Sequence, residues 1–280
     1  MSSANEKLQV LQRAETELLE AFCRLCDCCG LEYYLAFGTL LGAIRHQGFI
    51  PWDDDMDIYM KRPDYQRFLA LCESEAPEGF RVRTFRNTKP GEGNVSYQAK
   101  VESLNQFVLH NVGDHVDRQR IWIDIFVIDG MPKNILKRKL HVWNVQRHYT
   151  KCRLARASFS GIDPRRKRPL PEKIAAFALT KLGMKRFFSV EKQFAGLEKC
   201  LRRYDVAASD QVIGFESAYR KRCVYPAKVF DGTRQQMFEG KPRSIPEGWE
   251  WLLKHWYGDY MQLPPPEKRV AKHVADIIVD

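Results

Sequence analysis

Hydrophobic and polar positions alternate along the chain in patterns that predict helices and strands in turn. Apolar side chains recur at three- and four-residue steps over residues 6–29, which is typical of an amphipathic helix, and Gly30 is placed to end it. Apolar runs predict strands at 31–36, around 58–60 and at 80–85, with a helix from Asp64 to about Ser74 between the last two. Residues 95–110 are expected to form one long strand or two short ones.

The run from Ile121 to Gly130 predicts another strand, with a single carboxylate, Asp124, at its centre. A buried carboxylate without a partner costs roughly several kcal/mol. Two interpretations follow: Asp124 is a paired core residue, or its strand lies beside the acidic strand described below and adds a third carboxylate there. We favour the second, and we expect Asp129 to belong to the turn after the strand.

From residue 134 the pattern becomes helical and basic, with helices predicted at 134–158, 171–188 and 189–204, and strands and loops at 212–230. Residues 133–203 carry 20 lysines and arginines against four acids, a net charge of +16, whereas the remainder is −6. This asymmetry predicts a surface for an anionic partner, such as nucleic acid, phospholipid headgroups or a phosphorylated acceptor. The helix at 171–188 fits a membrane interface or an ordinary core-facing helix with solvated lysines.

A chain of 280 residues is long enough for one domain, or for one domain with a helical appendage. It has no apolar segment of membrane length, and its N-terminus lacks the pattern of a signal peptide. The eight cysteines show no paired framework. We therefore expect a cytoplasmic protein.

Four carboxylates occupy five positions, at Asp53, Asp54, Asp55 and Asp57. If the strand begins here, Asp55 and Asp57 point to one face while Met56 points into the core. Two carboxylates side by side suit Mg²⁺ or Mn²⁺. The alternative is an acidic surface turn. An EF-hand loop is disfavoured because its glycine and its closing glutamate are missing.

Residues near these acids could bind an anionic substrate. Gly38 and Thr39 follow the first predicted strand, where a glycine lets the backbone approach a phosphate and a helix start offers N–H groups. Arg45 and His46 lie one or two helical turns later and could steady a departing phosphate, although Arg45 could equally form a surface salt bridge. Trp52 could stack on a base, contact a quaternary ammonium or pack under the loop.

The phosphate turn followed by an acidic strand resembles the nucleotidyltransferase fold of the polymerase-β type. The longer string GTLLGAIRHQGFIPWDDDMDI resembles the signature of the LicD family of phosphocholine transferases, shared with fukutin-type ribitol-phosphate transferases. A second stretch, from Phe238 to His273, is similar to the same family, whereas the basic middle resembles it weakly.

The resemblance implies an α+β fold, with a mixed sheet flanked by helices and a basic helical insertion. It divides the chain into a catalytic core at 1–132, the insertion at 133–205, and a C-terminal segment at 206–280 that packs back on the core and completes the site.

The resemblance also implies a reaction: metal-dependent transfer of phosphocholine, or a similar alcohol phosphate, from CDP-choline or a related CDP-alcohol. The acceptor would be a hydroxyl of a lipid-linked glycan or glycolipid precursor of the cell surface, such as lipopolysaccharide or teichoic acid. Asp55, Asp57 and Asp124 would hold Mg²⁺ or Mn²⁺, and Asp124 would take the proton of the acceptor. Roles of Asp53 and His273 in substrate binding rest on the resemblance.

Three alternatives remain. The first is a nucleotidyltransferase that moves NMP to a small molecule or RNA, and the second is transfer of ribitol or glycerol phosphate. The third is a non-enzymatic basic nucleic-acid-binding module, which is disfavoured because stacking aromatics are missing and the acids would repel a phosphate backbone. We expect no nucleic-acid partner, and we expect peripheral contact with an anionic membrane at its inner face.

Overall fold

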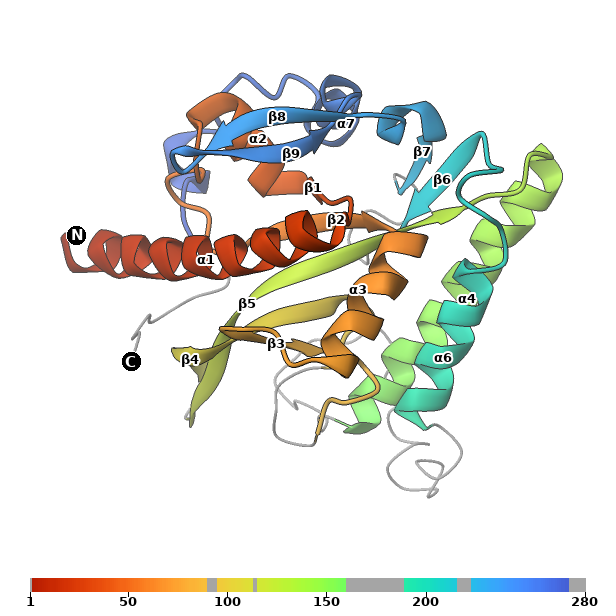
Figure 1. Ribbon diagram of the computed structural model, residues 1–280, viewed down its shortest axis with the longest axis horizontal. Helices are drawn as coiled ribbons and strands as arrows, with labels where there is room; N and C mark the ends of the chain where they lie inside the picture. Colours follow the sequence, from red (N-terminus) through yellow and green to blue (C-terminus); the bar gives the residue numbers. More distant parts are fainter. Residues whose placement is uncertain (1, 90–94, 113–114, 160–188, 216–222, 272–280) are drawn as a thin grey trace. The chain divides into compact units, whose positions relative to one another are not determined.

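The computed structural model describes residues 2–89, 95–112, 115–159, 189–215 and 223–271, which form a mixed α+β structure (Figure 1). Two compact units divide the chain. The first comprises residues 1–83, 98–128 and 212–280, and the second comprises residues 84–97 and 129–211. The predicted insertion at 133–205 falls within the second unit, whereas most of the predicted core shares the first unit with most of the C-terminal segment.

The first unit is built on a mixed sheet with the strand order β1-β2-β5-β4-β3. The strands are β1 (Tyr34–Leu35), β2 (Asp57–Lys61), β5 (His115–Gly130), β4 (Ala99–Val112) and β3 (Phe80–Arg83). Strands β2 and β5 run parallel, and the other neighbours in this order run antiparallel. Strand β6 (Gln211–Gly214) pairs with β5 and with β7 (Val224–Pro226). The prediction of a mixed sheet is confirmed.

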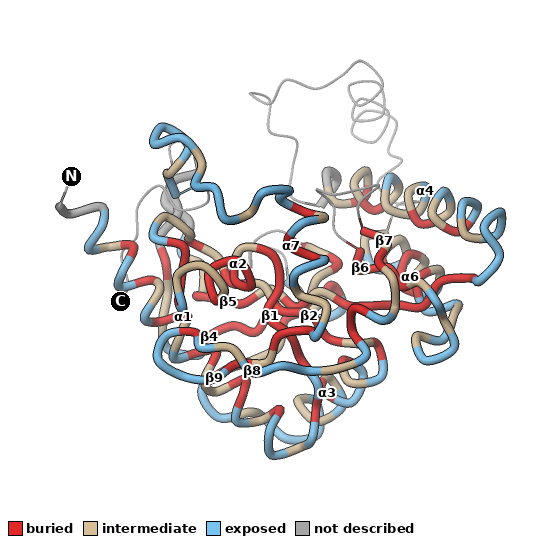
Figure 2. Tube along the Cα trace, turned by 90° about the horizontal axis from the view of Figure 1, so that it is seen from above, coloured by how far each residue is buried: buried red, intermediate tan, exposed pale blue. Residues whose placement is uncertain are grey.

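Helices α1 (Ser2–Cys29) and α3 (Arg62–Ser74) pack against this sheet. The predicted amphipathic pattern of α1 is confirmed, because Leu11, Leu18 and Phe22 are buried, and one stripe of the helix is red in Figure 2. The Phe22 ring meets those of Tyr33 and Phe68 edge-on, each with centroids 5.4 Å apart. Aromatic contacts therefore join α1 to α3.

The C-terminal segment joins the sheet through aromatic side chains of α7 (Trp249–Tyr257). The Trp256 ring lies 4.5 Å from that of Phe37, the first residue of α2 (Phe37–His46). Trp256 Nε1 donates to Tyr225 Oη, which lies 3.1 Å from Tyr59 Oη on β2. Phe37 has a φ of +43°, which is strained for a bulky residue, and this packing holds it there.

A two-stranded hairpin, β8 (Thr233–Phe238) and β9 (Lys241–Pro246), fixes the loop that follows α2. Its turn residues Glu239 and Gly240 have φ of +48° and +75°, as a tight two-residue hairpin requires. The Glu239 N–H donates to Gln47 O at 3.0 Å, and its Oε1 accepts from the Phe49 N–H at 3.1 Å. The C-terminal segment continues through the short helices η2 (Ala227–Phe230) and η3 (Pro266–Lys268).

The second unit is built around α4 (Ile135–Phe159) and α6 (Val190–Leu201), which pack against each other. These helices match the predictions at 134–158 and 189–204. The Ser189 side chain caps α6 by accepting from the Lys192 N–H. The helix predicted at 171–188 lies outside the described residues, as does the rest of the basic segment between residues 160 and 188.

Several boundaries differ from the predictions. The expected position of Asp129 in a turn is wrong: Asp129 lies inside β5 and is 1 % exposed, since the strand continues to Gly130. Strand β3 ends at Arg83, two residues early, and α3 begins at Arg62, with Pro63 in its first turn, where the missing N–H costs nothing. Among the described helices, none combines the length and apolar character needed to cross a membrane.

Candidate active site

The acidic stretch forms a loop, residues 52–56, between α2 and β2, called here the acid loop. Single carboxylate oxygens of Asp53, Asp54 and Asp55 lie within 4.8 Å of one another. Asp54 is buried, whereas Asp53 and Asp55 are half-buried. Side chains alternate from here into β2 as predicted, because Met56 is 1 % exposed while Asp55 and Asp57 keep contact with solvent.

Asp57 and Asp124 stand side by side at the start of their pairing, because β2 and β5 run parallel with these residues in register. The backbone hydrogen bonds between the two segments begin one residue before β2, where the Asp124 N–H donates to Met56 O at 2.9 Å. The prediction that Asp124 lies on a strand beside the acidic strand is therefore confirmed.

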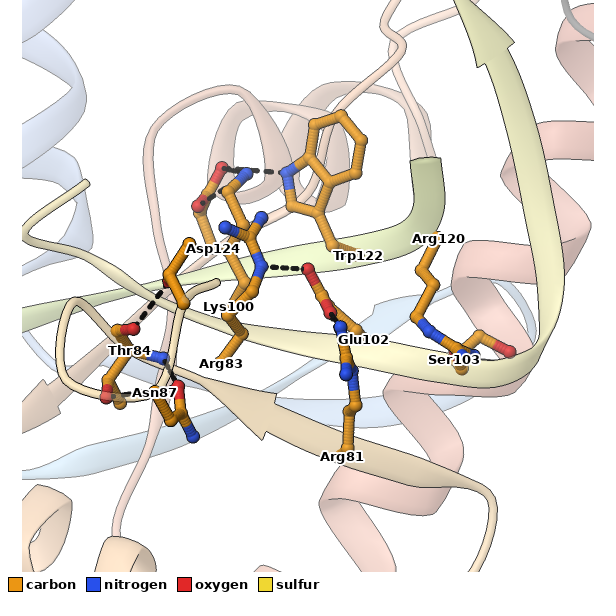
Figure 3. A network of polar contacts seen from close by, with 11 residues as sticks. Arg81, Arg83, Thr84, Asn87, Lys100, Glu102, Ser103, Arg120, Trp122 and Asp124 are labelled. Atoms are coloured by element: carbon orange, nitrogen blue, oxygen red, sulfur yellow. Dashed lines mark hydrogen bonds and ion pairs between the residues drawn. The ribbon is translucent and has the colours of Figure 1, made fainter. Parts of the chain in front are cut away.

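Two residues that the sequence reasoning missed hold the Asp124 carboxylate (Figure 3). Lys100 on β4 places Nζ 3.2 Å from Asp124 Oδ1, and Trp122 Nε1 donates to Oδ2 at 3.0 Å. Lys100 Nζ also lies 3.8 Å from the centroid of the Trp122 ring, a cation–π contact. Burial lowers the pKa of Lys100, and the charge of Asp124 opposes that shift. Lys100 reaches Asp124 because of the register between the antiparallel strands β4 and β5, in which the two residues lie opposite each other.

A second buried charge group lies two residues further along β4. Glu102, 3 % exposed, pairs with Arg83 and with Arg81, whose Nη2 lies 2.9 Å from Oε2 (Figure 3). Two arginines on one buried carboxylate satisfy most of its acceptor sites and tie β3 to β4. Lys100 thus projects from a strand that is fixed on both sides.

The start of α2 meets the acid loop at a glycine. A Cβ on Gly38 would lie 2.5 Å from Asp53 Oδ2, so any larger residue would push that carboxylate away. Next to it, Thr39 is 3 % exposed, and its Oγ1 accepts from the Asp57 N–H at 2.9 Å. Both residues therefore position the acids, and their binding of phosphate remains a prediction.

A cavity of about 540 Å³ opens beside the acid loop. Its walls include four predicted substrate-binding residues: Gly38, Arg45, Trp52 and Asp53. Leu41, Ile50 and residues of the C-terminal segment between 257 and 270 complete the walls. Such a volume suits a small-molecule ligand. His273 lies outside the described residues.

Two arginines, Arg45 and Arg269, line the cavity together with two aspartates, Asp53 and Asp259. Arg45 Nη1 donates to Tyr260 O at 2.8 Å, and its Nε donates to His46 Nε2 at 3.0 Å. Burial and the charge of Arg45 lower the pKa of His46, which keeps Nε2 able to accept. The Arg269 guanidinium stands over the Trp52 ring, 5.7 Å from its centroid.

Helix α1 contributes a carboxylate that the sequence reasoning also missed. Glu15 is 3 % exposed, and its pKa is raised well above the usual value, first by burial and then by Asp55 and the other nearby acids. One turn earlier, Gln12 Nε2 donates to Asp53 O at 2.9 Å and ties α1 to the acid loop. A charged residue on the apolar face of α1, between Leu11 and Leu18, was the available signal.

The carboxylates of Asp53, Asp54 and Asp55, which lie within 4.8 Å of one another, fit a hard divalent cation. Asp57 and Asp124, which were predicted to bind the metal together with Asp55, are not part of this close group. All its side-chain donors are carboxylate oxygens, which Mg²⁺ and Mn²⁺ prefer. Glu15 Oε2 is buried and has no hydrogen-bond partner, as expected of an oxygen that needs a cation.

Comparisons with known proteins place the chain in a family and give several relatives. Residues 30–170 match the family model described as LicD/FKTN/FKRP, nucleotidyltransferase domain. The lipopolysaccharide cholinephosphotransferase LicD of Haemophilus influenzae is 28 % identical over 264 residues, which cover 94 % of each chain. An uncharacterized protein of Rickettsia typhi is 42 % identical over 53 residues, 19 % of this chain and 17 % of its own. One of Rickettsia prowazekii is 56 % identical over 34 residues, 12 % of this chain and 13 % of its own.

Proposed function

Because the chain belongs to the LicD/FKTN/FKRP nucleotidyltransferase-domain family, we propose that it is a transferase that moves phosphocholine onto lipopolysaccharide. The observation that carries this proposal is the similarity to a lipopolysaccharide cholinephosphotransferase over 94 % of both chains. Two observations support it: Asp57 and Asp124 lie side by side on neighbouring strands, and Asp53 of the acid loop lines a cavity. We also propose that the sheet and its helices form a nucleotidyltransferase-like fold of the polymerase-β type.

The proposed donor is CDP-choline or a related CDP-alcohol. A diphosphate brings negative charge into the cavity, where Arg45 and Arg269 can attract it. Backbone N–H groups at the start of α2, around Gly38 and Thr39, would hold phosphate oxygens. Trp52 offers an aromatic face to the base or to the quaternary ammonium of choline.

Asp55, Asp57 and Asp124 would hold Mg²⁺ or Mn²⁺. A bound divalent cation would neutralise the donor phosphates and stabilise the leaving CMP. The carboxylates of the acid loop would repel an anionic donor, and a cation bound between them and the donor phosphates would remove that repulsion.

In the proposed reaction, an acceptor hydroxyl attacks the phosphorus that carries choline. A new O–P bond forms, the bond between that phosphorus and the oxygen of CMP breaks, and CMP leaves. Asp124 takes the hydroxyl proton as general base. Lys100 and Trp122 would orient its carboxylate, since both contact Asp124.

The test is incubation of the full chain with Mg²⁺, lipopolysaccharide and a panel of CDP-alcohols, with CMP release and product mass as readouts. Release of CMP and a mass gain of phosphocholine are expected with CDP-choline. A mass gain of ribitol or glycerol phosphate would change the headgroup. A mass gain of a nucleotide would replace the proposal with nucleotidyl transfer.

We further propose that the protein works in the cytoplasm, in peripheral contact with the anionic inner face of the membrane. Support comes from α4, on which Leu136, Leu140 and Trp143 are each more than half exposed. These residues recur at four- and three-residue steps, so they form one stripe, and buried His141 and Val145 lie on the opposite side. Residues 133–159 carry eight lysines and arginines and no acid. Apolar and basic groups together suit an anionic lipid surface.

A further inference from the structure

Glu15 presents a buried carboxyl group that the packing of the fold does not explain. It lies in the middle of α1, on the face that packs against the sheet, and is 3 % exposed. Its Oε2 is buried and has no hydrogen-bond partner. Buried carboxylates are normally paired or bind metals, because the unpaired charge costs free energy.

The surroundings of Glu15 make its position more unfavourable still. The charged groups that act on it most strongly are all carboxylates, namely Asp55, Asp53, Asp54 and Asp124, in that order. Helix α1 is also fixed to the same loop by Gln12, one turn before Glu15. Glu15 is therefore near enough to the acid loop for these charges to act on it, and a cation there would relieve the repulsion.

We infer that Glu15 is a further ligand of the divalent cation at the acid loop, supplied by α1. This inference rests on the metal dependence in the proposed function. Glu15 lies before residues 30–170, the stretch that matches the family model, so that match does not assign it. With Glu15, the cation would have ligands from helix α1 as well as from the acid loop and the strands. Cation binding would then link α1 to the sheet.

Two opposite effects of Glu15→Gln follow. Without metal, burial of Glu15 beside other acids costs free energy, because the group must either keep a charge there or take up a proton. The neutral amide avoids that cost, so the variant should unfold at a higher temperature than the wild type. With metal, it has lost a charged ligand, so Mn²⁺ should bind about tenfold more weakly or worse and raise the melting temperature less. A residue that merely packs in the core would give neither the weaker binding nor the smaller rise.

The experiment compares full-length wild type and variant after treatment with EDTA, by thermal unfolding and by calorimetric titration with Mn²⁺. Glu17→Gln is the matched control: it makes the same change of charge two residues along α1, at an exposed position that accepts from Gln106, and should leave Mn²⁺ binding unchanged. If the amide variant does not fold, Glu15→Met supplies the same comparison.

Mn²⁺ affinity in Glu15→Gln equal to that of the wild type would overturn the inference, and so would absence of Mn²⁺ binding by the wild type. CMP release, measured in parallel, separates this result from the proposed function. Unchanged Mn²⁺ affinity with normal phosphocholine transfer would remove Glu15 as a ligand and leave the proposed function standing. Weakened Mn²⁺ binding would support the ligand even if no CDP-alcohol proved to be a donor.

Discussion

Lys100 Nζ lies 3.2 Å from Asp124 Oδ1, so the Asp124 carboxylate forms an ion pair with a lysine of the same chain. The Lys100 and Asp124 side chains are 14 % and 22 % exposed, so the attraction is only partly screened. Trp122 contacts both partners and limits how far either can turn. Asp124 is thereby held in one orientation beside Asp57.

Removal of one member of the Lys100–Asp124 ion pair should lower the free energy of unfolding more than removal of both. Asp124→Asn leaves the Lys100 charge without its counterion, and we expect a loss of about 1–3 kcal/mol in the free energy of unfolding, below the roughly 3–5 kcal/mol for a fully buried pair. Lys100→Met with Asp124→Asn should recover part of that loss but none of the activity. Denaturant unfolding of both single variants and the double variant tests this coupling. Additive effects would show that the pair is not coupled.

Asp55→Asn and Asp57→Asn should each abolish transfer while the protein remains folded. Both residues are half-buried on the face away from the core, so the substitution changes charge and not packing. CMP release at ordinary Mg²⁺ measures the effect, and circular dichroism checks the fold. Asp231→Asn, at an exposed position, is the control and should behave as wild type. Full activity in either site variant would contradict the assignment of these residues to the metal.

The placement of the acidic residues could be predicted from the sequence, whereas the residues that contact them could not. Alternation over Asp55, Met56 and Asp57 predicts which side chains face the core, and the apolar run around Asp124 predicts its strand, because both signals are local. Lys100 reaches Asp124 only through the register of β4 on β5, which periodicity does not fix. Glu15 belongs to a helix distant in sequence, and only packing shows that its face meets the acid loop.

Gly38→Ala should lower activity more than stability. Its new Cβ would meet Asp53 Oδ2 at 2.5 Å, and the carboxylate would have to move. A displacement of about 1 Å at a reacting centre can cost on the order of 100-fold in rate, so we expect a fall of about 10- to 100-fold in kcat/KM. Gly232→Ala, whose Cβ would lie 3.4 Å from Glu247, is the matched control. A Gly38→Ala enzyme as active as wild type would show that the Asp53 position is not critical.

His141 makes stability dependent on pH in the second unit. Burial, and then the charge of Arg203, lower the pKa of His141 to about 4 from an ordinary value near 6.5, and its buried Nε2 lacks a hydrogen-bond partner. The folded state thus binds fewer protons than the unfolded state, so stability is complete above about pH 6.5 and falls as the pH drops toward 4. The expected loss at pH 5 is about 2 kcal/mol.

His141→Phe keeps a ring against Tyr204, whose centroid lies 5.0 Å from that of His141, and removes the titration. Unfolding of the two proteins should therefore diverge below about pH 6.5, with the variant more stable. His255→Gln, at a half-exposed position, should show the same dependence of stability on pH as the wild type. If the stability of His141→Phe fell with pH as steeply as that of the wild type, another group would control stability below about pH 6.5.

The exposed stripe of α4 should bind anionic membranes. Each lysine or arginine near such a surface contributes about 1 kcal/mol, and Lys133, Lys137 and Lys139 are exposed near the start of the helix. Trp143, 58 % exposed, adds an amphipathic ring that suits the interface. We expect co-sedimentation with anionic vesicles, none with neutral vesicles, and loss of binding as salt approaches molar strength.

Replacement of Leu136, Leu140 and Trp143 by serine should weaken vesicle binding by about tenfold or more, because the apolar area that enters the interface is lost. A control that replaces Val10, Met237 and Trp251, exposed apolar residues of the first unit, should bind as wild type. Turnover of a soluble acceptor should be equal in all three proteins, since the stripe contains none of the proposed site residues. Equal vesicle binding by the two triple variants would exclude α4 as the membrane contact, and indifference of the wild type to anionic vesicles would exclude the contact itself.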